Sequence, residues 1–449
     1  MAFPIRLGRF LWGRVATFQK GTSPPDPNDV VTPDERYNIR LLTLEAPFTS
    51  VALTGIVNFF ALFAIRLGAS NALIGWLTSG PALISLLFLV PLGRLTQGAR
   101  SYAHVMAAGA LGQRVFVLAL ALVPFLPPAW RPWSVVAAVT VSTLPSVLWV
   151  LGFHAACGEM FGPRRMARLV SQRWAAANAA NVISVLLLGR LVDALPFPLN
   201  FQLLFVGVGL ITLLTVFFVL RLRLPALDPS EGEPPAGQAK PQESAWQWIK
   251  RHRACVRYEM GIFIGYLALF AAVPLFRIHW VRDLGATGAW LGGITAAASA
   301  GVMVGNLLWG RWSRPDRDRR NLLIASAGAM GLYPILVGSS NSLLLQAGIV
   351  MLGGFLAAGN DLILFNRTVQ VTPRRQRPTF IAIHNVVTNL AGFLAPVASA
   401  ALVDVLGARS VLWAVGALGF AGALAIYVLG WDEERADGGR PAPSPAPAG

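Results

Sequence analysis

Two titratable side chains interrupt apolar stretches in the second half of this sequence. Asp361 lies about 9 Å of helix before the next basic residue, and His384 lies about 10 Å of helix after the preceding one. A carboxylate and an imidazole at similar depths in a partly dry cavity can exchange protons near neutral pH. We therefore predict a proton-coupling site at Asp361 and His384. The alternative is a static contact of Asp361 with Asn385 or Asn389.

Arg114 is charged and lies deep within an apolar stretch. It is about eleven residues, roughly 16 Å of helix, from either end of that stretch. Such a charge costs about 2.5–3.5 kcal/mol at the centre of a membrane. It could bind an anionic group of a substrate or a coupling carboxylate, and a structural contact with a partner or with carbonyl groups is the alternative. Glu159 and Arg173 end neighbouring apolar stretches, and we expect them to form a structural ion pair.

Uncharged polar residues recur at helical spacing in the same stretches. Ser50, Thr54 and Asn58 repeat every four residues, which places them on one helix face. Polar side chains inside a membrane should face the interior of a helix bundle or a wet cavity. The alternative is that Ser and Thr bond their own backbone and Asn joins helices. The candidate substrate-binding residues are Asn58, Arg114, Asn178, Tyr266, Asn306 and Asn385.

Long apolar helices must position these residues. Charged residues make up only 13% of the chain, against roughly 25% in soluble domains, and 55% of the residues are hydrophobic. The apolar residues form runs of about twenty, which is the length that crosses a bilayer as a helix. These runs predict twelve transmembrane helices, the first of them over Ala46–Ile65.

The formal net charge of +16 comes from basic residues in particular loops. About thirty of the 37 Lys and Arg residues fall in the two tails and in alternate loops, and only six lie at the opposite helix ends. This bias predicts a multi-pass protein of the cell (inner) membrane, with both termini cytoplasmic. The lipid bilayer, and not nucleic acid, is the partner that this distribution indicates.

Composition divides the chain into five parts. We expect a cytoplasmic N-terminal segment over 1–44, a six-helix bundle over 45–223 and a cytoplasmic linker over 224–258. A second six-helix bundle follows over 259–431, and a disordered cytoplasmic tail over 432–449.

An internal repeat supports two equivalent bundles. Ile74-Gly75-Trp76 aligns with Leu291-Gly292-Gly293 at an offset of 217 residues, and Leu191-Val192-Asp193 recurs as Leu402-Val403-Asp404 at an offset of 211. Parallel repeats of this kind place a substrate path between the halves near mid-membrane.

A basic loop follows the second helix of each half, beginning with Gly93-Arg94 and with Gly310-Arg311. In each half a further basic loop leads into an Asn-bearing helix, and a long linker joins the halves. In these features the chain resembles the Major Facilitator Superfamily from about Leu44 to Trp431. The resemblance implies an all-α membrane protein with twelve transmembrane helices in two pseudo-symmetric six-helix bundles. The loop-motif residues are Gly93, Arg94, Arg100, Gly310 and Arg311.

The resemblance implies a transporter that works by alternating access, as a symporter or an antiporter, and not an enzyme. The loop motif departs from the family pattern, which has Asp where this chain has Gln97 and Arg314. The Arg of the fourth helix and the Gly-Pro pattern of the fifth helix, found in proton-coupled drug exporters, are also missing.

We therefore expect a small organic solute as the substrate and protons as the coupling ion. No Gly-rich Lys-Ser/Thr loop occurs that would bind ATP, and we expect a monomer without a cofactor. The alternatives are efflux of drugs or amphiphiles by the same fold, a membrane-embedded sensor, and a lipid-modifying enzyme.

Overall fold

Long apolar helices account for most of the chain. The computed structural model describes residues 32–52, 56–161, 163–224, 253–312, 319–371 and 377–429, and within these ranges it contains helices and no strand. The expected tail over 432–449, most of the linker and most of the N-terminal segment lie outside the described residues.

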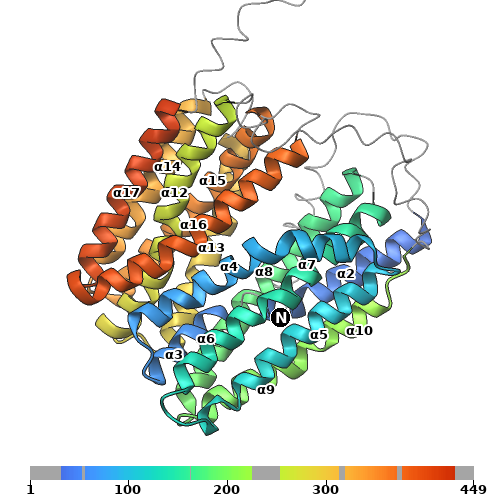
Figure 1. Ribbon diagram of the computed structural model, residues 1–449, viewed down its shortest axis with the longest axis horizontal. Helices are drawn as coiled ribbons and strands as arrows, with labels where there is room; N and C mark the ends of the chain where they lie inside the picture. The colour runs from blue at the N-terminus through green and yellow to red at the C-terminus, as the bar shows by residue number, and fades with distance from the viewer. Residues whose placement is uncertain are drawn as a thin grey trace, which may run out of the picture.

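Each half forms a bundle of helices (Figure 1). The helices of the first half are α2 (Pro33–Ser50), α3 (Val57–Arg66), α4 (Asn71–Gln97), α5 (Tyr102–Leu120), α6 (Arg131–Val141), α7 (Thr143–Met160), α8 (Pro163–Ala194), α9 (Leu199–Thr212) and α10 (Leu214–Leu220). Those of the second half are α12 (Arg253–Ile278), α13 (Gly288–Trp312), α14 (Arg319–Ser339), α15 (Leu343–Val371), α16 (Arg377–Leu406) and α17 (Ala408–Leu429).

Ten segments of the described chain are long and apolar enough to cross a membrane. Two of them are pairs of successive helices, α6 with α7 and α9 with α10, as single spans would require. The two remaining expected spans correspond to α2 with α3 and to α14, whose described apolar parts are shorter. The predicted fold class, an all-helical membrane protein in two bundles, is confirmed.

The first expected span, Ala46–Ile65, comprises the end of α2 and nearly the whole of α3, and residues 53–55 between them lie outside the described residues. α2 ends at Ser50, a π-type turn follows, and α3 begins only at Val57. Pro47 removes one backbone donor from the last turn of α2, which weakens the helix near its end. Asn58 therefore lies in the first turn of α3, while Thr54 lies outside the described residues.

Polar caps fix the first described helix at its start. The Thr32 side chain accepts a hydrogen bond from the Glu35 backbone N–H, and the Glu35 carboxylate accepts one from the Thr32 N–H, which forms a capping box. Partial burial alone would raise the pKa of Glu35, but the bond from Thr32 and the Arg165 guanidinium lower it below its usual value. Glu35 therefore ties the start of α2 to α8.

The two halves meet along two equivalent helix pairs. α4 of the first half packs on α16 of the second, and α13 of the second half packs on α8 of the first. In Figure 1 the bundles lie close together at the end that carries α3 and diverge toward the other end. We call the α3 end the outer end, because the charge bias predicts that it faces away from the cytoplasm.

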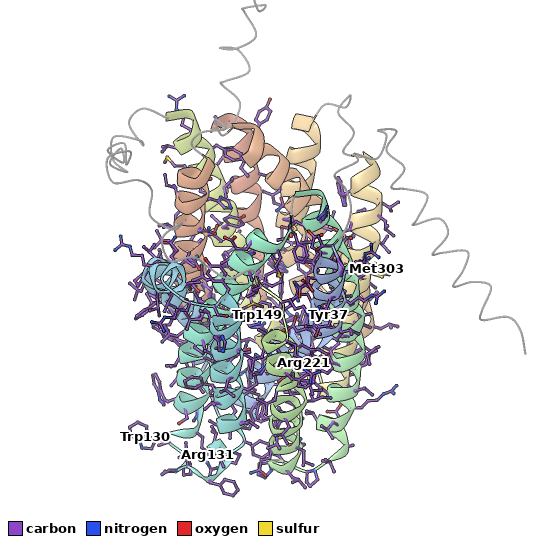
Figure 2. All side chains as sticks on the ribbon, turned by 90° about the vertical axis from the view of Figure 1, so that its right-hand side faces the viewer. Tyr37, Trp130, Arg131, Trp149, Arg221 and Met303 are labelled. Carbon is purple, nitrogen blue, oxygen red and sulfur yellow. The ribbon has the colours of Figure 1, made fainter. Side chains whose placement is uncertain are left out.

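Chain reversals at the outer end use equivalent glycines in the two halves. Gly68 follows α3 and Gly285 follows the π-helix His279–Asp283, and they have φ values of 85° and 66°, which side chains rarely adopt. Trp130 and Arg131 lie at the lower extremity of Figure 2, and Trp130 is exposed. An exposed Trp at a span end suits the membrane–water interface.

Gly75 lets α4 and α16 approach closely. A Cβ at this position would lie 2.6 Å from the Pro396 carbonyl oxygen and 2.9 Å from the Ala400 Cβ. We expect Gly75→Ala to destabilise the folded protein by about 1–3 kcal/mol, because neither helix backbone can yield without loss of packing. Gly207→Ala is the matched control, since nothing lies within 4 Å of its added Cβ. Melting temperatures of the purified variants would check this, and equal effects at both positions would contradict it.

Candidate functional site

A carboxylate, an imidazole and a phenol form a cluster within the second half. His384 of α16 places Nδ1 3.1 Å from the Glu259 carboxylate of α12, and its Nε2 lies 3.5 Å from the Tyr266 hydroxyl. Glu259 is buried and His384 is half-buried. Both ring nitrogens therefore have a partner that can exchange a hydrogen-bonded proton.

Asp361 belongs to the same region but is more open. It lies on α15, its side chain is exposed, and it acts electrostatically on the Tyr266 phenol. The amide of Asn389 donates to the Asn385 backbone carbonyl at 2.8 Å and is thus occupied within α16. Sequence reasoning selected Asp361 and His384 but missed Glu259, the direct partner of His384. Glu259 stands at the boundary of an apolar run, where a charge is unremarkable.

Four side chains mark one face of α12. Glu259, Tyr266, Phe270 and Arg277 follow one another at spacings of seven, four and seven residues, so they lie on the same helix face. The Tyr266 and Phe270 rings are 5.9 Å apart. This stripe runs from a buried acid at the inner end to a guanidinium nearer the outer end.

Arg277 joins the second half to the first. Its Nε donates to the Asn58 Oδ1 at 3.2 Å, and the Asn58 amide donates to the Thr295 Oγ1 of α13 at 2.6 Å. Asn58, predicted to bind substrate, is thus held between two helices of the opposite half.

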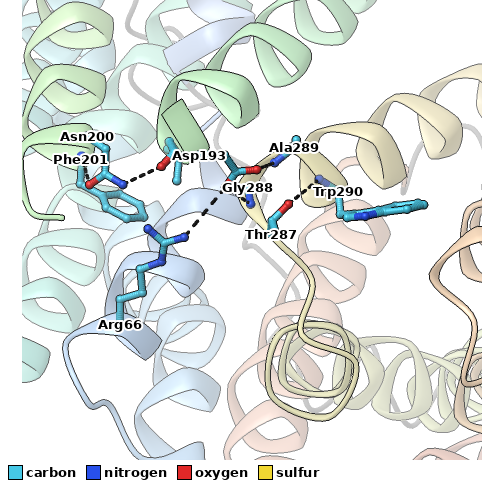
Figure 3. A network of polar contacts seen from close by, with 9 residues as sticks. Arg66, Asp193, Asn200, Phe201, Thr287, Gly288, Ala289 and Trp290 are labelled. Atoms are coloured by element: carbon cyan, nitrogen blue, oxygen red, sulfur yellow. Dashed lines mark hydrogen bonds and ion pairs between the residues drawn. The ribbon is translucent and has the colours of Figure 1, made fainter. Parts of the chain in front are cut away.

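A latch at the outer end connects α8 to α13. Asp193, at the end of α8, accepts hydrogen bonds from the Gly288 and Ala289 backbone N–H groups at 2.8 and 2.7 Å, and Arg66 lies 4.0 Å away (Figure 3). A carboxylate at a helix N-terminus is favoured by the free N–H groups and by the helix dipole. The Asp193 contact therefore holds the two halves together at this end.

The repeat places a second latch on the other side of the seam. Asp404, at the end of α16, accepts a hydrogen bond at 2.6 Å from the amide of Asn71, the first residue of α4. Arg282 donates to Asn71 Oδ1 at 2.7 Å and also to the Ala69 carbonyl. Asp193 and Asp404 come from the repeated Leu-Val-Asp segments, and both bridge the halves.

A buried ion pair lies within the first half, and the expected pairing of Arg173 with Glu159 is wrong. Arg173 of α8 instead donates to Glu45 of α2 at 2.5 Å, and its guanidinium carbon lies 4.5 Å from the Phe153 ring centre. Glu45 is fully buried, and Thr49 donates to it. Glu159 is exposed. Arg173 therefore pairs with the buried acid, Glu45, and not with the exposed one, Glu159.

Arg114 lies away from the seam, between α5, α9 and α10. Its guanidinium donates to the carbonyls of Ala110 and Thr212 and to the side chains of Gln113 and Thr215, at 2.8–3.4 Å. All three of its nitrogens are used, and every acceptor is neutral. This arrangement fits the carbonyl-contact alternative.

The remaining predicted residues are scattered. Asn178 on α8 is half-buried and Asn306 on α13 is exposed, and neither has a hydrogen bond to another described side chain. Gly93, Arg94 and Arg100 lie in or just after the last turns of α4, with both arginines exposed, whereas the side-chain surroundings of Gly310 and Arg311 lie outside the described residues. Among the described residues no cluster of His, Cys, Asp and Glu could hold a metal ion.

An apolar cavity of the second half adjoins the cluster. It has a volume of about 50 Å³ between α12, α14, α15 and α17, and Tyr266, Phe276, Tyr333 and Asn360 contribute to its lining. Its aromatic lining with a few polar groups is of the kind that binds organic groups, but pockets for such ligands hold roughly 300–1,000 Å³, so this one would have to widen to admit one.

Comparisons with known proteins agree with this geometry. The family model of the Major Facilitator Superfamily matches residues 259–448. None of the curated protein sequences matches the chain at a significant level.

Solved structures extend the likeness to both halves, at low sequence identity. A mutant of the nucleoside transporter NupG superposes with a TM-score of 0.67 and 12% identity, over 88% of this chain and 99% of that one. The D-xylose–proton symporter gives 0.64 and 14%, over 87% and 96%. A bacterial homologue of the human lysosomal transporter Spinster, inward-facing and unoccupied, gives 0.64 and 12%, over 89% and 97%.

The ten apolar spans of the described residues indicate a membrane protein, and the similar solved structures are of transporters. The family model thus covers the second half of the chain, and the solved structures share the fold over nearly the whole of it, as the resemblance to the Major Facilitator Superfamily led us to expect.

Proposed function

We propose that this protein moves a small organic solute across the cell membrane by alternating access, driven by protons that bind at the cluster of Glu259, His384 and Asp361. The observation that supports it best is the contact of His384 on α16 with both Glu259 and Tyr266 on α12. Hydrogen bonds join the His384 ring to a carboxylate and to a phenol, which gives a proton a path between them, and Asp361 is open enough to receive one.

The proposed site for the solute lies between the halves and in the adjoining apolar cavity. Asn58 and Tyr266 supply polar contacts, and the aromatic lining next to Tyr266 supplies apolar area. Asn178, Asn306 and Asn385 remain candidates at more distant points of the same path. The neutral contacts that use up the Arg114 guanidinium favour a structural role for that residue.

The proposed topology has both termini in the cytoplasm and two six-helix units joined by a cytoplasmic linker. The latches at Asp193 and Asp404 then close the outer side, in keeping with the likeness to an inward-facing Spinster homologue. The protein would work as a monomer in the bilayer. The similar structures include a proton symporter and a nucleoside transporter, which supports an organic substrate and proton coupling.

Proton movement in liposomes that hold the purified protein tests this function. A pH-sensitive dye is enclosed, and organic acids, sugars, amino acids, nucleosides and amphiphiles are added outside. We expect at least one solute to move protons, and Asp361→Asn or Glu259→Gln to abolish this proton movement while exchange of labelled solute persists.

Glu159→Gln is the matched control, because Glu159 is an exposed acid of the first half. It should retain proton movement. If the Asp361 and Glu259 variants still moved protons at the wild-type rate, the coupling site would be wrong. If solutes crossed without protons in the wild type, the protein would be a uniporter or would use another ion.

A further inference from the structure

The Arg277 guanidinium has hydrogen-bond donors that its described neighbours do not match. Among the described residues its one hydrogen bond runs from Nε to Asn58 Oδ1, and its two terminal nitrogens have no acceptor there. Asn58 is already oriented, because its amide nitrogen donates to Thr295 and its oxygen must then face the guanidinium. The terminal nitrogens offer a planar pair of donors, the geometry that matches a carboxylate or phosphate.

The buried arginines Arg114 and Arg173 differ from Arg277, which is half-buried. Arg114 uses all three nitrogens on neutral oxygens, and Arg173 has Glu45 as its counter-charge. Within the described residues, Arg277 has neither a counter-charge nor a full set of acceptors. A guanidinium within a membrane span that lacks a counter-charge and acceptors raises the free energy of the protein, and a bound anion would lower it.

The start of α3 adds a second, independent feature. α3 begins at Val57 without a side-chain cap, so its N-terminal turn, which includes Asn58, presents the positive end of the helix dipole at the seam. Interrupted membrane helices with their N-termini at a binding site receive anionic groups in several transporter folds. Arg277 and the α3 N-terminus therefore favour the same sign of charge at the same place.

The position of this site relates it to transport. Asn58 comes from the first half, and Arg277 and Thr295 come from the second. The group lies inward of the latches, since Arg66 and Arg282 follow Asn58 and Arg277 toward the outer end. An anion bound here would contact both halves and would be exposed to one side or the other as they rock.

We infer that the transported solute carries an anionic group, a carboxylate, sulfonate or phosphate, and that Arg277 binds it beside Asn58 at the start of α3. This inference rests on the proposed transport function and names the chemistry of the substrate. Arg277 acts as a specificity-determining residue, since a neutral analogue would leave its donors unmatched.

Thermal stabilisation of the purified full-length protein tests the inference. Benzoate, benzenesulfonate and phenyl phosphate are compared with benzamide and benzyl alcohol at constant ionic strength. We expect at least one acid, and neither neutral compound, to raise the melting temperature. Arg277→Gln should weaken this binding by about tenfold or more, as expected for the loss of a charge-assisted contact. Arg190→Gln, which removes the same charge from an exposed position on α8, should bind like the wild type.

A second variant needs no ligand. Asn58→Asp would place a carboxylate where the amide oxygen now lies 3.2 Å from Arg277. We expect it to raise the melting temperature of the ligand-free protein and to abolish the stabilisation by acids. A lower melting temperature for Asn58→Asp, or acid stabilisation that persists in Arg277→Gln, would overturn the inference.

Two further arms separate the possible sources of the anion. Stabilisation by inorganic phosphate or phosphatidylglycerol, with none by the organic acids, would overturn the assignment to an organic solute. Absence of any acid effect in the wild type would overturn the site itself. Failure of the proton-coupling proposal is recognised separately, because it concerns proton flux in Asp361 and Glu259 variants and leaves the Arg277-dependent binding intact.

Discussion

Replacement of Glu45 by Ala is expected to destabilise the folded protein by about 3–5 kcal/mol, because Glu45 is the one acid that pairs with the buried Arg173 guanidinium among the described residues. Arg173 is 8% exposed and would keep only the Leu42 carbonyl and two aromatic rings as partners. The lost stability is the cost of leaving the Arg173 charge buried without a partner. It does not measure how much the ion pair itself contributes to the free energy of folding. Denaturation of the purified protein in mixed micelles, or its melting temperature, would measure the change.

A double variant separates these two contributions. Glu45→Met with Arg173→Met removes both charges and retains side-chain volume, so most of the lost stability should return. Asp34→Ala, which breaks an exposed pair with Arg223, should leave the melting temperature nearly unchanged. If the double variant were as unstable as Glu45→Ala, loss of the ion pair itself would explain the instability, and the unpaired Arg173 charge would not.

The sequence was sufficient to predict the spans and the duplication. Charge-free runs of about twenty residues have few structural solutions in lipid, and the basic loops add an independent check. The end of α2 at Ser50 and the start of α3 at Val57 were not predictable from hydropathy, because the whole run Ala46–Ile65 is apolar or uncharged. Pro47 was the local signal of a weakened helix, and it was not sufficient to locate the end of α2.

The ion pairs were harder to predict than the helices. Glu45 and Glu259 each stand at the edge of an apolar run, so neither looked costly in sequence, yet both are buried. Pairing depends on which helix faces meet, and His384 and Arg173 each have several acids within reach along the chain. The contact of Asn58 with Arg277 likewise depends on the approach of α3 to α12, across 219 residues of sequence.

The two acid–base pairs are equivalent in position and different in chemistry. Glu45 and Glu259 are 214 residues apart, and Arg173 and His384 are 211 apart, close to the offsets of the sequence repeat. Each joins the first helix of its half to the fifth. An Arg remains charged at every accessible pH, whereas a His can lose its proton. This difference supports placing proton coupling in the second half and a fixed structural pair in the first.

Removal of both outer latches is expected to increase the population of the outward-open state. Asp193→Ala deletes the acceptors of two backbone N–H groups on α13, and Asp404→Ala deletes the partner of Asn71 on α4. A hydrogen bond to a charged group contributes about 1.5–3 kcal/mol. Since both contacts bridge the halves, each is lost when that end opens. A change of about 1.4 kcal/mol alters a two-state population roughly tenfold, so the double variant should shift it by at least that factor.

Cysteine labelling from outside would detect this shift. Ser299→Cys lies one helical turn inward of Thr295 on α13, in a protein whose Cys157 and Cys255 are replaced by Ser. A membrane-impermeant thiol reagent added outside should label it slowly in this background and about tenfold faster when both latch acids are removed.

Asp283→Ala is the matched control for the latch acids. Asp283 is also an acid at the outer end, but its partner is His279, 2.7 Å away within the same π-helix, so no contact between the halves is lost. Its labelling rate should equal that of the background. If Asp193→Ala with Asp404→Ala also left the rate unchanged, close packing at glycines such as Gly75 and Gly292 would have to hold the outer end closed without help from the acids. The opposite result would make the repeated Leu-Val-Asp segments the charged part of the outer gate, one from each half, each acting on the first turn of a helix in the other.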